Sequence, residues 1–232
     1  MGLTAGEALS NNDKRNFFTY GEFPLESFDE LFHRAIQHFY ERNDHDQSKP
    51  IKIVDVGSGC GRLLMHAALN SEYSSSKLDI HGVEISSEMH EYACRIVDRG
   101  VEQGLFQQTE SKDQNHNYNN DDTTPATCTR TQMTLHNGSA QDLSHIFSDA
   151  DIIFAYCSVW ETGGFAIEER AMLMGRDMTD ALAKSCKHGC VAVMTDRLLL
   201  DEGSVGWEYV DSLEVENPDL LGSTGYFSIL NK

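Results

Sequence analysis

A glycine-rich segment offers the clearest chemistry in the chain. It carries one acid and three glycines separated by single residues: Asp55-Val-Gly57-Ser58-Gly59-Cys-Gly61. The segment follows the β-branched run 51–56 and precedes the apolar run 63–69, a pattern that predicts a strand, a tight turn and a buried helix. Glycines in such a turn let a ligand approach the backbone without meeting a Cβ atom. The segment therefore predicts a ligand-binding loop, with a ligand-free turn as the alternative.

A carboxylate ends the next predicted strand. Residues 78–83 alternate as a strand, and Glu84 follows them, 23 residues after Gly61. An acid at the tip of this strand can accept hydrogen bonds from both hydroxyls of a ribose. A strand-end glutamate alone is more often simply solvated, but its spacing from the glycine loop favours a nucleotide ligand.

The spacing of the glycines separates two classes of nucleotide-binding enzyme. A dinucleotide fingerprint requires a glycine at position 62, where the chain has Arg62. The sequence resembles instead motif I of the class I methyltransferases, with glycines at 57, 59 and 61 and the acid Asp55 two residues before them. The resemblance implies S-adenosyl-L-methionine as cofactor, lying along Gly57, Ser58, Gly59 and Gly61, with Glu84 on its ribose. An NAD-dependent oxidoreductase is the alternative from another class.

Two further loops follow predicted strands. In the methyltransferase superfamily the loop after the third strand contacts adenine, which assigns Ser139 and Ala140 to the cofactor site; Ser139 replaces the usual acid, and Asp142 is the alternative contact. A helix cap at Ser139 or Asp142 is the structural alternative. The residues after the strand 151–156 line the acceptor pocket in that superfamily, which assigns Tyr156 and Trp160 to it.

Aromatic walls suit an amine acceptor, because a partly dry pocket lowers the pKa of the amine by disfavouring its charged form. Tyr156, Trp160 and Phe165 are the candidate walls, with ordinary core packing as the alternative. No general base is assigned, and His136 and His145 are interpreted as structural.

A narrower resemblance rests on short pieces. They are Thr19-Tyr20-Gly21-Glu22 before an amphipathic helix, the Gly-Val-Glu end of the second strand, the Ile-Phe pair of the fourth and Ser223-Thr-Gly-Tyr226. These pieces resemble the non-SET histone lysine methyltransferases of the disruptor-of-telomeric-silencing type. The resemblance implies that Tyr20 and Glu22 cover the cofactor and that lysine of a histone-type protein accepts the methyl group. The chain departs from that family at Tyr156 and Cys157, where the family has paired asparagines.

Three alternatives therefore stay open for the acceptor: a small molecule, another protein, or none, in a cofactor-binding module without catalysis.

Elements that position these residues follow from apolar periodicity. Helical spacing covers 25–39 after Pro24, strand patterns recur along the chain, and apolar residues at helical spacing from Ile167 to Leu182 predict a long helix ending near Gly189. The strands expected are 51–56, 78–83, 132–136, 151–156, 190–195, 207–215 and 225–230. We expect an α/β fold: a seven-stranded, mostly parallel Rossmann-like sheet with a C-terminal antiparallel hairpin and helices on both faces.

The organisation along the chain follows from composition. Residues 1–49 are interpreted as an N-terminal loop and helical cap, and residues 50–232 as the methyltransferase core. Within the core, 107–130 is rich in Asn, Asp, Gln, Ser and Thr, and such a composition cannot bury apolar surface. We interpret it as a disordered insertion.

Charge and cysteine usage restrict the partners. The chain has 18 basic and 37 acidic residues, a formal net charge of −19. Direct nucleic-acid binding is not expected from such a charge, whereas a basic protein is permitted. No apolar stretch is long enough for a membrane span and the N-terminus is polar, so we expect an intracellular protein, cytoplasmic or nuclear. Of six cysteines none forms a CxxC pair, and Cys186-x-His188-x-Cys190 lacks a second ligand pair, so no metal is expected.

Overall fold

The computed structural model describes most of the chain beyond position 20. The described residues are 21–43, 46, 49–70, 73, 77–105, 107–108, 132–158, 160–199 and 206–231. Within them, no helix is both long and apolar enough to cross a membrane. Tyr20 lies outside the described residues.

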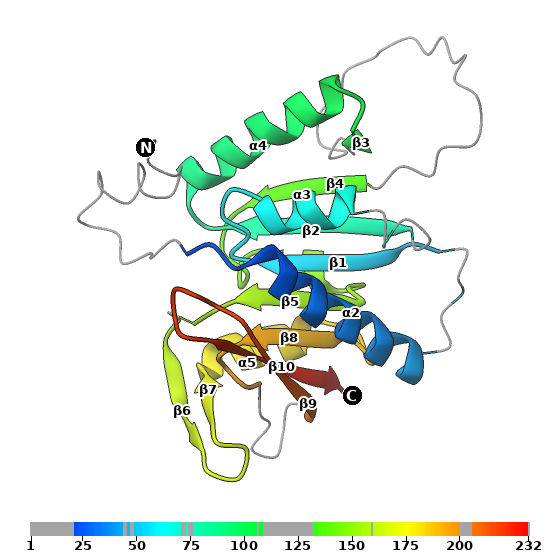
Figure 1. The fold of residues 1–232 in the computed structure, drawn as a ribbon. Helices are drawn as coiled ribbons and strands as arrows, with labels where there is room; N and C mark the ends of the chain where they lie inside the picture. The colour runs from blue at the N-terminus through cyan, green and yellow to red at the C-terminus, as the bar shows by residue number, and fades with distance from the viewer. Residues whose placement is uncertain are drawn as a thin grey trace.

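One open sheet organises the fold (Figure 1). Its strands are β1 Ile51–Val56, β2 Leu78–Glu84, β3 Gln107–Gln108, β4 Gln132–Asn137, β5 Ile152–Tyr156, β8 Val191–Thr195, β9 Trp207–Val215 and β10 Ser223–Leu230. They lie in the order β3-β4-β2-β1-β5-β8-β10-β9. The pairs from β3 to β8 are parallel, and β10 is antiparallel to β8 and β9. This confirms the predicted seven-stranded, mostly parallel sheet with its terminal hairpin, and adds β3 at one edge.

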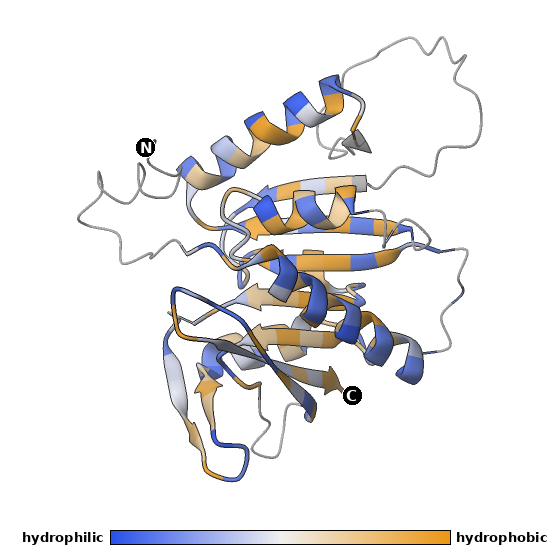
Figure 2. Ribbon diagram, viewed as in Figure 1, coloured by the Kyte–Doolittle hydropathy of each residue, from blue (hydrophilic) through white to orange (hydrophobic). Residues whose placement is uncertain are grey.

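Helices cover both faces of the sheet, as predicted. One face carries α2 Leu25–Arg42, α3 Arg62–Leu69 and α4 Ser87–Glu102; the other carries the 3-10 helix η2 Ser144–Phe147 and α5 Arg176–Ser185 (Figure 1). Alternate residues of one strand enter the two cores: Ile53 packs below α2 and α3, and Val54 packs on the η2 side. Strands buried on both faces read as continuous apolar runs, which Figure 2 shows along the centre of the sheet.

Register brings the two predicted cofactor elements to one edge. β1 and β2 are parallel with Val56 opposite Val83, so both strands end side by side. The turn 57–61 connects β1 to α3, and α4 begins after the cap Ser86, whose hydroxyl accepts a hydrogen bond from the backbone N–H of Met89 at 3.4 Å. The glycine loop and Glu84 therefore share the carboxyl edge of the sheet.

The long helix predicted between 167 and 189 is wrong in its first half. Residues 162–174 form an antiparallel hairpin of β6 Thr162–Ala166 and β7 Ala171–Met174, and only α5 is helical. The apolar residues fit a helical spacing, but most of them also fit two short strands around the turn 167–170, which contains three charged residues and whose last residue, Arg170, has φ 53°. The segment forms a hairpin in place of the first half of the predicted helix because Ala166 and Ala171 are buried against Leu198.

The predicted domain division is not tested by these contacts, and it stays a prediction. Phe28, Leu31 and Phe32 of α2 lie in the same apolar cluster as Phe154 of β5, so the helix of the predicted cap packs directly on the sheet. Of the predicted insertion, Gln107 and Gln108 pair with β4 as β3. Residues 109–131 lie outside the described residues.

Candidate functional site

The glycine loop has a backbone that few other residues could adopt. Gly57, Gly59 and Gly61 have φ values of 77°, 55° and 76°, in the left-handed region. The N–H groups of Gly57 and Ser58 donate to the carbonyl oxygen of Val83 at 2.8 and 3.1 Å, which binds the loop to the end of β2. The predicted tight turn is therefore present, and its binding of a ligand stays a prediction.

Glu84 points at that turn. One carboxylate oxygen accepts a hydrogen bond from the Gly59 N–H at 2.8 Å, and the other accepts from the Ser86 N–H at 2.7 Å. The residue is only 8% exposed. Each carboxylate oxygen has two lone pairs, so both can accept a further hydrogen bond from a ligand hydroxyl. The loop and the acid therefore converge on one place.

A second buried acid lies beneath the loop. Asp55 is 4% exposed, and its pKa is raised to about 7, first by burial and then by the nearby charge of Glu84. Two buried carboxylates this close disfavour ionisation of one of them. A cation bound next to them would favour the ionised form.

The loop after β4 is tied to the same strand end. The Gly138 N–H and the Asn137 side-chain amide each donate to the carbonyl oxygen of Glu84 at 2.9 Å. The Ser139 hydroxyl accepts from the Asp142 N–H at 3.2 Å, and Ala140 is buried in the core on the η2 side. Ser139 thus stabilises a turn, whereas the cap position of η2 is Leu143, so the helix cap expected at Ser139 or Asp142 is not what the structure shows. The predicted contact of Ser139 with adenine stays a prediction.

Arg62 joins the N-terminal segment to the site. Its guanidinium donates to the carbonyl oxygen of Phe23 at 2.7 Å, and its Nε lies 4.0 Å from the carboxylate of Glu22. A Cβ atom on Gly21 would lie 3.0 Å from the ring of Tyr156. The segment 21–23 therefore runs from the start of α3 to the end of β5. Arg62 stands where a dinucleotide-binding loop would have a glycine, and in this chain it holds the segment 21–23 in place.

The two predicted acceptor aromatics pack on opposite faces of the sheet, Tyr156 against the core on the α2 side and Trp160 against the core on the η2 side. The Trp160 ring rests over the glycine loop, since a Cβ atom on Gly57 would lie 3.1 Å from it. The Tyr156 hydroxyl accepts a hydrogen bond from the Asn217 amide at 3.3 Å, and its ring packs 5.1 Å from that of Phe23. Phe165, the third candidate wall, is instead 56% exposed on β6.

Arg197 is a residue that the sequence interpretation missed. Its guanidinium donates to the carbonyl oxygens of Ser158 at 2.8 Å, Trp160 at 2.9 Å and Asp196 at 2.7 Å. Three carbonyls on one rigid cation fix the path of the segment that carries Trp160. The signal was available, because Arg197 follows the predicted strand 190–195 at the carboxyl edge, where ligands collect.

Asp196 is a second residue that the sequence analysis missed, although it also follows the predicted strand 190–195. Its carboxylate accepts hydrogen bonds from the hydroxyls of Ser158 and Ser223, the latter at 3.0 Å, and from the Thr224 N–H at 2.8 Å. The Asn217 amide also donates to Ser223 at 2.8 Å. A continuous polar network therefore joins the ends of β5 and β8 to the start of β10.

We keep the interpretation of His136 and His145 as structural residues. Nδ1 of His81 and Nε2 of His136 lie 3.0 Å apart with nearly parallel rings. The pKa of His136 is lowered to about 4, mainly by burial and then by His81. Among the residues the structure describes, no group of three His, Cys, Asp or Glu side chains could hold a metal, and Cys186 and Cys190 are buried.

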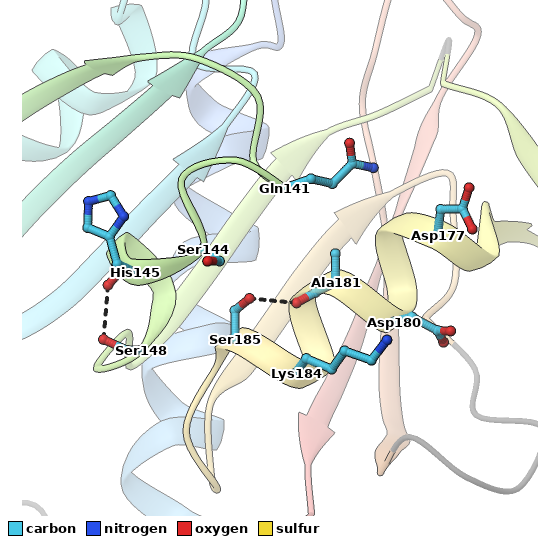
Figure 3. Close-up of a pocket in the computed structure, with 9 residues that line it drawn as sticks. All are labelled: Gln141, Ser144, His145, Ser148, Asp177, Asp180, Ala181, Lys184 and Ser185. Atoms are coloured by element: carbon cyan, nitrogen blue, oxygen red, sulfur yellow. Dashed lines mark hydrogen bonds between the residues drawn. The ribbon is translucent and has the colours of Figure 1, made fainter.

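An open groove of about 830 Å³ lies between η2 and α5 (Figure 3). Its walls are polar and of mixed charge: Gln141, Ser144, His145, Ser148, Asp177, Asp180, Ala181, Lys184 and Ser185. Only Gln141 belongs to the loop after β4, and neither the glycine loop nor Glu84 lines it. The candidate site is therefore defined by the convergence of Glu84 and the glycine loop and not by the groove.

No protein-family model matches the chain, and no curated protein matches its sequence. Solved structures share its architecture. One is a protein from Listeria monocytogenes described as a class I S-adenosylmethionine-dependent methyltransferase, with a TM-score of 0.55 and 9% identity over 97% of this chain and 66% of that one. Another is the rRNA methyltransferase AviRa from Streptomyces viridochromogenes, with a TM-score of 0.54 and 14% identity over 90% of this chain and 86% of that one. At these identities the likeness is one of fold: the chain has the Rossmann-like fold found in class I methyltransferases.

Proposed function

We propose that the chain is an S-adenosyl-L-methionine-dependent methyltransferase. The observation that carries the proposal is the hydrogen bond from the Gly59 N–H to the Glu84 carboxylate, at the edge where β1 and β2 end. This bond joins the glycine loop to the carboxylate that we propose accepts the ribose hydroxyls. The fold shared with class I methyltransferases supports the same ligand.

The residues present fit such a cofactor. Gly57, Gly59 and Gly61 offer left-handed backbone with no side chains of their own, beside the Trp160 ring, and Glu84 keeps lone pairs for the ribose hydroxyls. The buried, partly protonated Asp55 favours a positively charged ligand. When bound, the cofactor supplies a methyl group on a cationic sulfur. Ser139 and Ala140 are proposed beside the adenine.

The segment before α2 completes the proposed cofactor site. Glu22 is held beside the start of α3 by Arg62, and Tyr20 is proposed to cover the cofactor with it.

Tyr156 and Trp160 are proposed to hold the acceptor. Their task is positional, because the acceptor atom must sit about 3 Å from the methyl carbon and in line with the departing sulfur. An amine acceptor must first lose a proton, and aromatic walls favour its neutral form. With the cofactor bound, the lone pair of the acceptor nitrogen would form the new bond to the methyl carbon, and the electron pair of the broken carbon–sulfur bond would stay on the sulfur.

We propose lysine of a basic, histone-type protein as the acceptor. Acidic residues neighbour the aromatic segments in sequence: Glu22 follows Gly21, Glu161 follows Trp160, and Asp219 donates its backbone N–H to Asn217, which bonds Tyr156. Glu161 and Asp219 are exposed, and the net charge of the chain is −19. Such charges attract cationic chains and repel phosphate backbones.

Calorimetry and transfer assays test the two levels separately. S-adenosylhomocysteine and NAD are titrated into the protein; binding of NAD alone would reject the methyltransferase proposal. Transfer of a labelled methyl group is then measured with histone octamers, total RNA and a pool of metabolites. Labelled lysine in the histones supports the proposed acceptor, label in RNA or metabolites rejects it, and cofactor binding without any transfer indicates a binding module.

A further inference from the structure

The β6–β7 hairpin extends directly from the proposed acceptor segment. β6 begins two residues after Trp160. On its inner side, β7 is paired: the Met174 N–H donates to the Leu198 carbonyl at 2.9 Å, and the Leu198 N–H donates to the Met172 carbonyl at 2.8 Å. On its outer side, β6 has no partner strand in the part of the chain that the structure describes, and Figure 1 shows it at the margin of the molecule.

The outer strand lacks the usual protection of an edge. Exposed edges are normally blocked by lysine, proline or a covering element, because their free N–H and C=O groups pair with other chains. β6 reads Thr-Gly-Gly-Phe-Ala, and its first four residues are exposed. Gly164 is paired with Leu173 of β7, and the Thr162 hydroxyl also accepts from the Gly164 N–H at 3.2 Å and donates to its carbonyl oxygen at 3.0 Å. The N–H and C=O groups of β6 that point away from β7 are the ones that an added strand would pair with.

Apolar side chains accompany the open edge. Phe165 lies opposite Met172 in the hairpin, and they are 56% and 39% exposed; Ile167, at the turn, is 82% exposed. The hairpin's inner contacts come from Ala166 and Ala171, which pack on Leu198. A bound strand would therefore find apolar side chains to cover as well as a backbone to pair with.

The charges around β6 favour a basic binding partner. Glu161 precedes β6, and Glu168 and Glu169 stand in the turn beyond it, with Arg170 as the one opposing charge in that turn. The chain as a whole carries −19, so a second copy or a nucleic acid meets like charge at this edge. An extended basic segment meets opposite charge at both ends of β6.

We propose that the outer edge of β6 binds an extended basic segment of the protein substrate as an added β-strand. This inference rests on the proposed function, because it makes β6 the arm that presents a lysine to Tyr156 and Trp160. Five residues of strand span about 16 Å. The target lysine therefore lies within a few residues of a segment that alternates basic and apolar side chains.

A designed peptide tests the backbone pairing. The probe is a fluorescein-labelled decapeptide of alternating lysine and valine; its control has the same sequence with every backbone amide N-methylated, which keeps the charge and removes the donors. Binding to the full chain is followed by fluorescence anisotropy. We expect the N-methylated peptide to bind at least about tenfold more weakly, since strand addition depends on main-chain hydrogen bonds. Equal binding of both peptides overturns the proposal.

A matched pair of variants tests the place. Phe165→Ser with Met172→Ser removes the apolar pair, and Leu105→Ser changes a leucine of similar exposure, 52%, just beyond α4 at the opposite end of the molecule (Figure 1). We expect about tenfold weaker peptide binding only in the hairpin variant, with unchanged melting temperatures. Equal loss in both variants, or none in the hairpin variant, overturns the proposal.

Two further measurements separate the outcomes. Sedimentation shows whether β6 pairs with a second copy: a wild-type dimer that the hairpin variant dissociates would overturn the peptide proposal. Calorimetry with S-adenosylhomocysteine is run on the same samples. If wild-type protein binds S-adenosylhomocysteine but not the peptide, the proposed strand addition at β6 is refuted and the proposed function is not. Absence of ligand binding refutes the proposed function, whatever the peptide does.

Discussion

The two halves of the carboxyl edge are built differently. In the proposed cofactor half, which consists of the loop 57–61 and Glu84, the Glu84 carboxylate accepts from the N–H of Gly59, and backbone groups make most of the contacts. In the acceptor half, side chains from three strand ends meet: Ser158 bonds Asp196, 38 residues away, and Asp196 bonds Ser223, 27 residues further on. The backbone contacts of the glycine loop follow from one short sequence motif. The side-chain network around Asp196 forms only when the sheet brings its strand ends together.

The halves also differ in charge balance. Asp55 and Glu84 are buried beside each other, and their repulsion contributes to the raised pKa of Asp55. Asp196 instead accepts three hydrogen bonds, and Arg197 satisfies three carbonyl oxygens. The cofactor half therefore carries uncompensated charge that a cation can relieve, while the acceptor half is satisfied within the protein.

Asp55→Asn gives the largest test of this difference. With a pKa of about 7 in the folded protein, Asp55 keeps its proton between pH 4 and 7 while the unfolded chain has lost it. Folded protein then binds more protons, so stability falls as pH rises through this window, by about 4 kcal/mol in total. Urea unfolding of wild type and Asp55→Asn should show the variant gaining about this much relative to wild type. Parallel pH profiles would contradict the buried charge.

The same titration predicts a pH-dependent affinity. If S-adenosylmethionine binds the ionised form of Asp55, its affinity should rise about tenfold from pH 6 to 8. The rise should disappear in Asp55→Asn. Calorimetry at both pH values measures it, and a flat wild-type profile would place the ligand's charge elsewhere.

Gly59→Leu attacks the glycine loop itself. A leucine at this left-handed position fills ligand space and displaces the N–H that donates to Glu84. We expect S-adenosylhomocysteine to lose about a hundredfold in affinity, close to 3 kcal/mol. Gly104→Leu is the control, because Gly104 has φ 70° with open space around it at the end of α4. Similar losses in both variants would show a general folding defect.

Local patterns explain how much of the fold was predictable. The strands 51–56, 78–83 and 132–136 and the glycine loop were predicted within about one residue, because each is a short run with its own period or turn chemistry. The convergence of Glu84 with the loop also followed, since parallel neighbours end at one edge.

The acceptor half could not be predicted in the same way. Ile167, Ala171 and Met174 fit a helical spacing, and only burial of Ala171 against Leu198 makes the segment a hairpin. Asp196 and Arg197 follow a predicted strand, which places them at the carboxyl edge, but their contacts with Ser158 and Ser223 are distant in sequence and no local period reveals them. Tertiary contacts position these residues, so the sequence analysis missed Asp196 and Arg197, and the assignment of Tyr156 and Trp160 to the acceptor stays a prediction.

Glu84→Gln tests whether the carboxylate, and not merely its shape, serves the cofactor half. The carboxylate accepts hydrogen bonds from Gly59 and Ser86 with different oxygens. An amide has one oxygen, so its NH₂ must face one of these N–H groups. We expect a loss of about 2 kcal/mol in affinity for S-adenosylhomocysteine. Glu88→Gln, an exposed residue in the first turn of α4, should change the affinity less than twofold.

Arg197→Lys gives the smallest expected effect and the sharpest contrast between the halves. Lysine keeps the charge but cannot direct donors at three carbonyls at once. Trp160 should then lose its fixed place over the glycine loop, and methyl transfer should slow about fivefold, the loss of about 1 kcal/mol of positioning. Affinity for S-adenosylhomocysteine should change less, because Gly59 and Glu84 are untouched.

Trp160 itself reports the change. Trp207 is the other tryptophan of the chain and is buried with its indole N–H bonded to Thr179, so Trp207→Phe leaves Trp160 as the single fluorophore. In that background Arg197→Lys should shift and broaden the emission, while Arg176→Lys, an exposed arginine on α5, should not. Slower transfer with unchanged emission would mean that Arg197 acts through the network around Asp196 and not through Trp160. The acceptor half would then depend on charge as the cofactor half does, and the contrast between them would be lost.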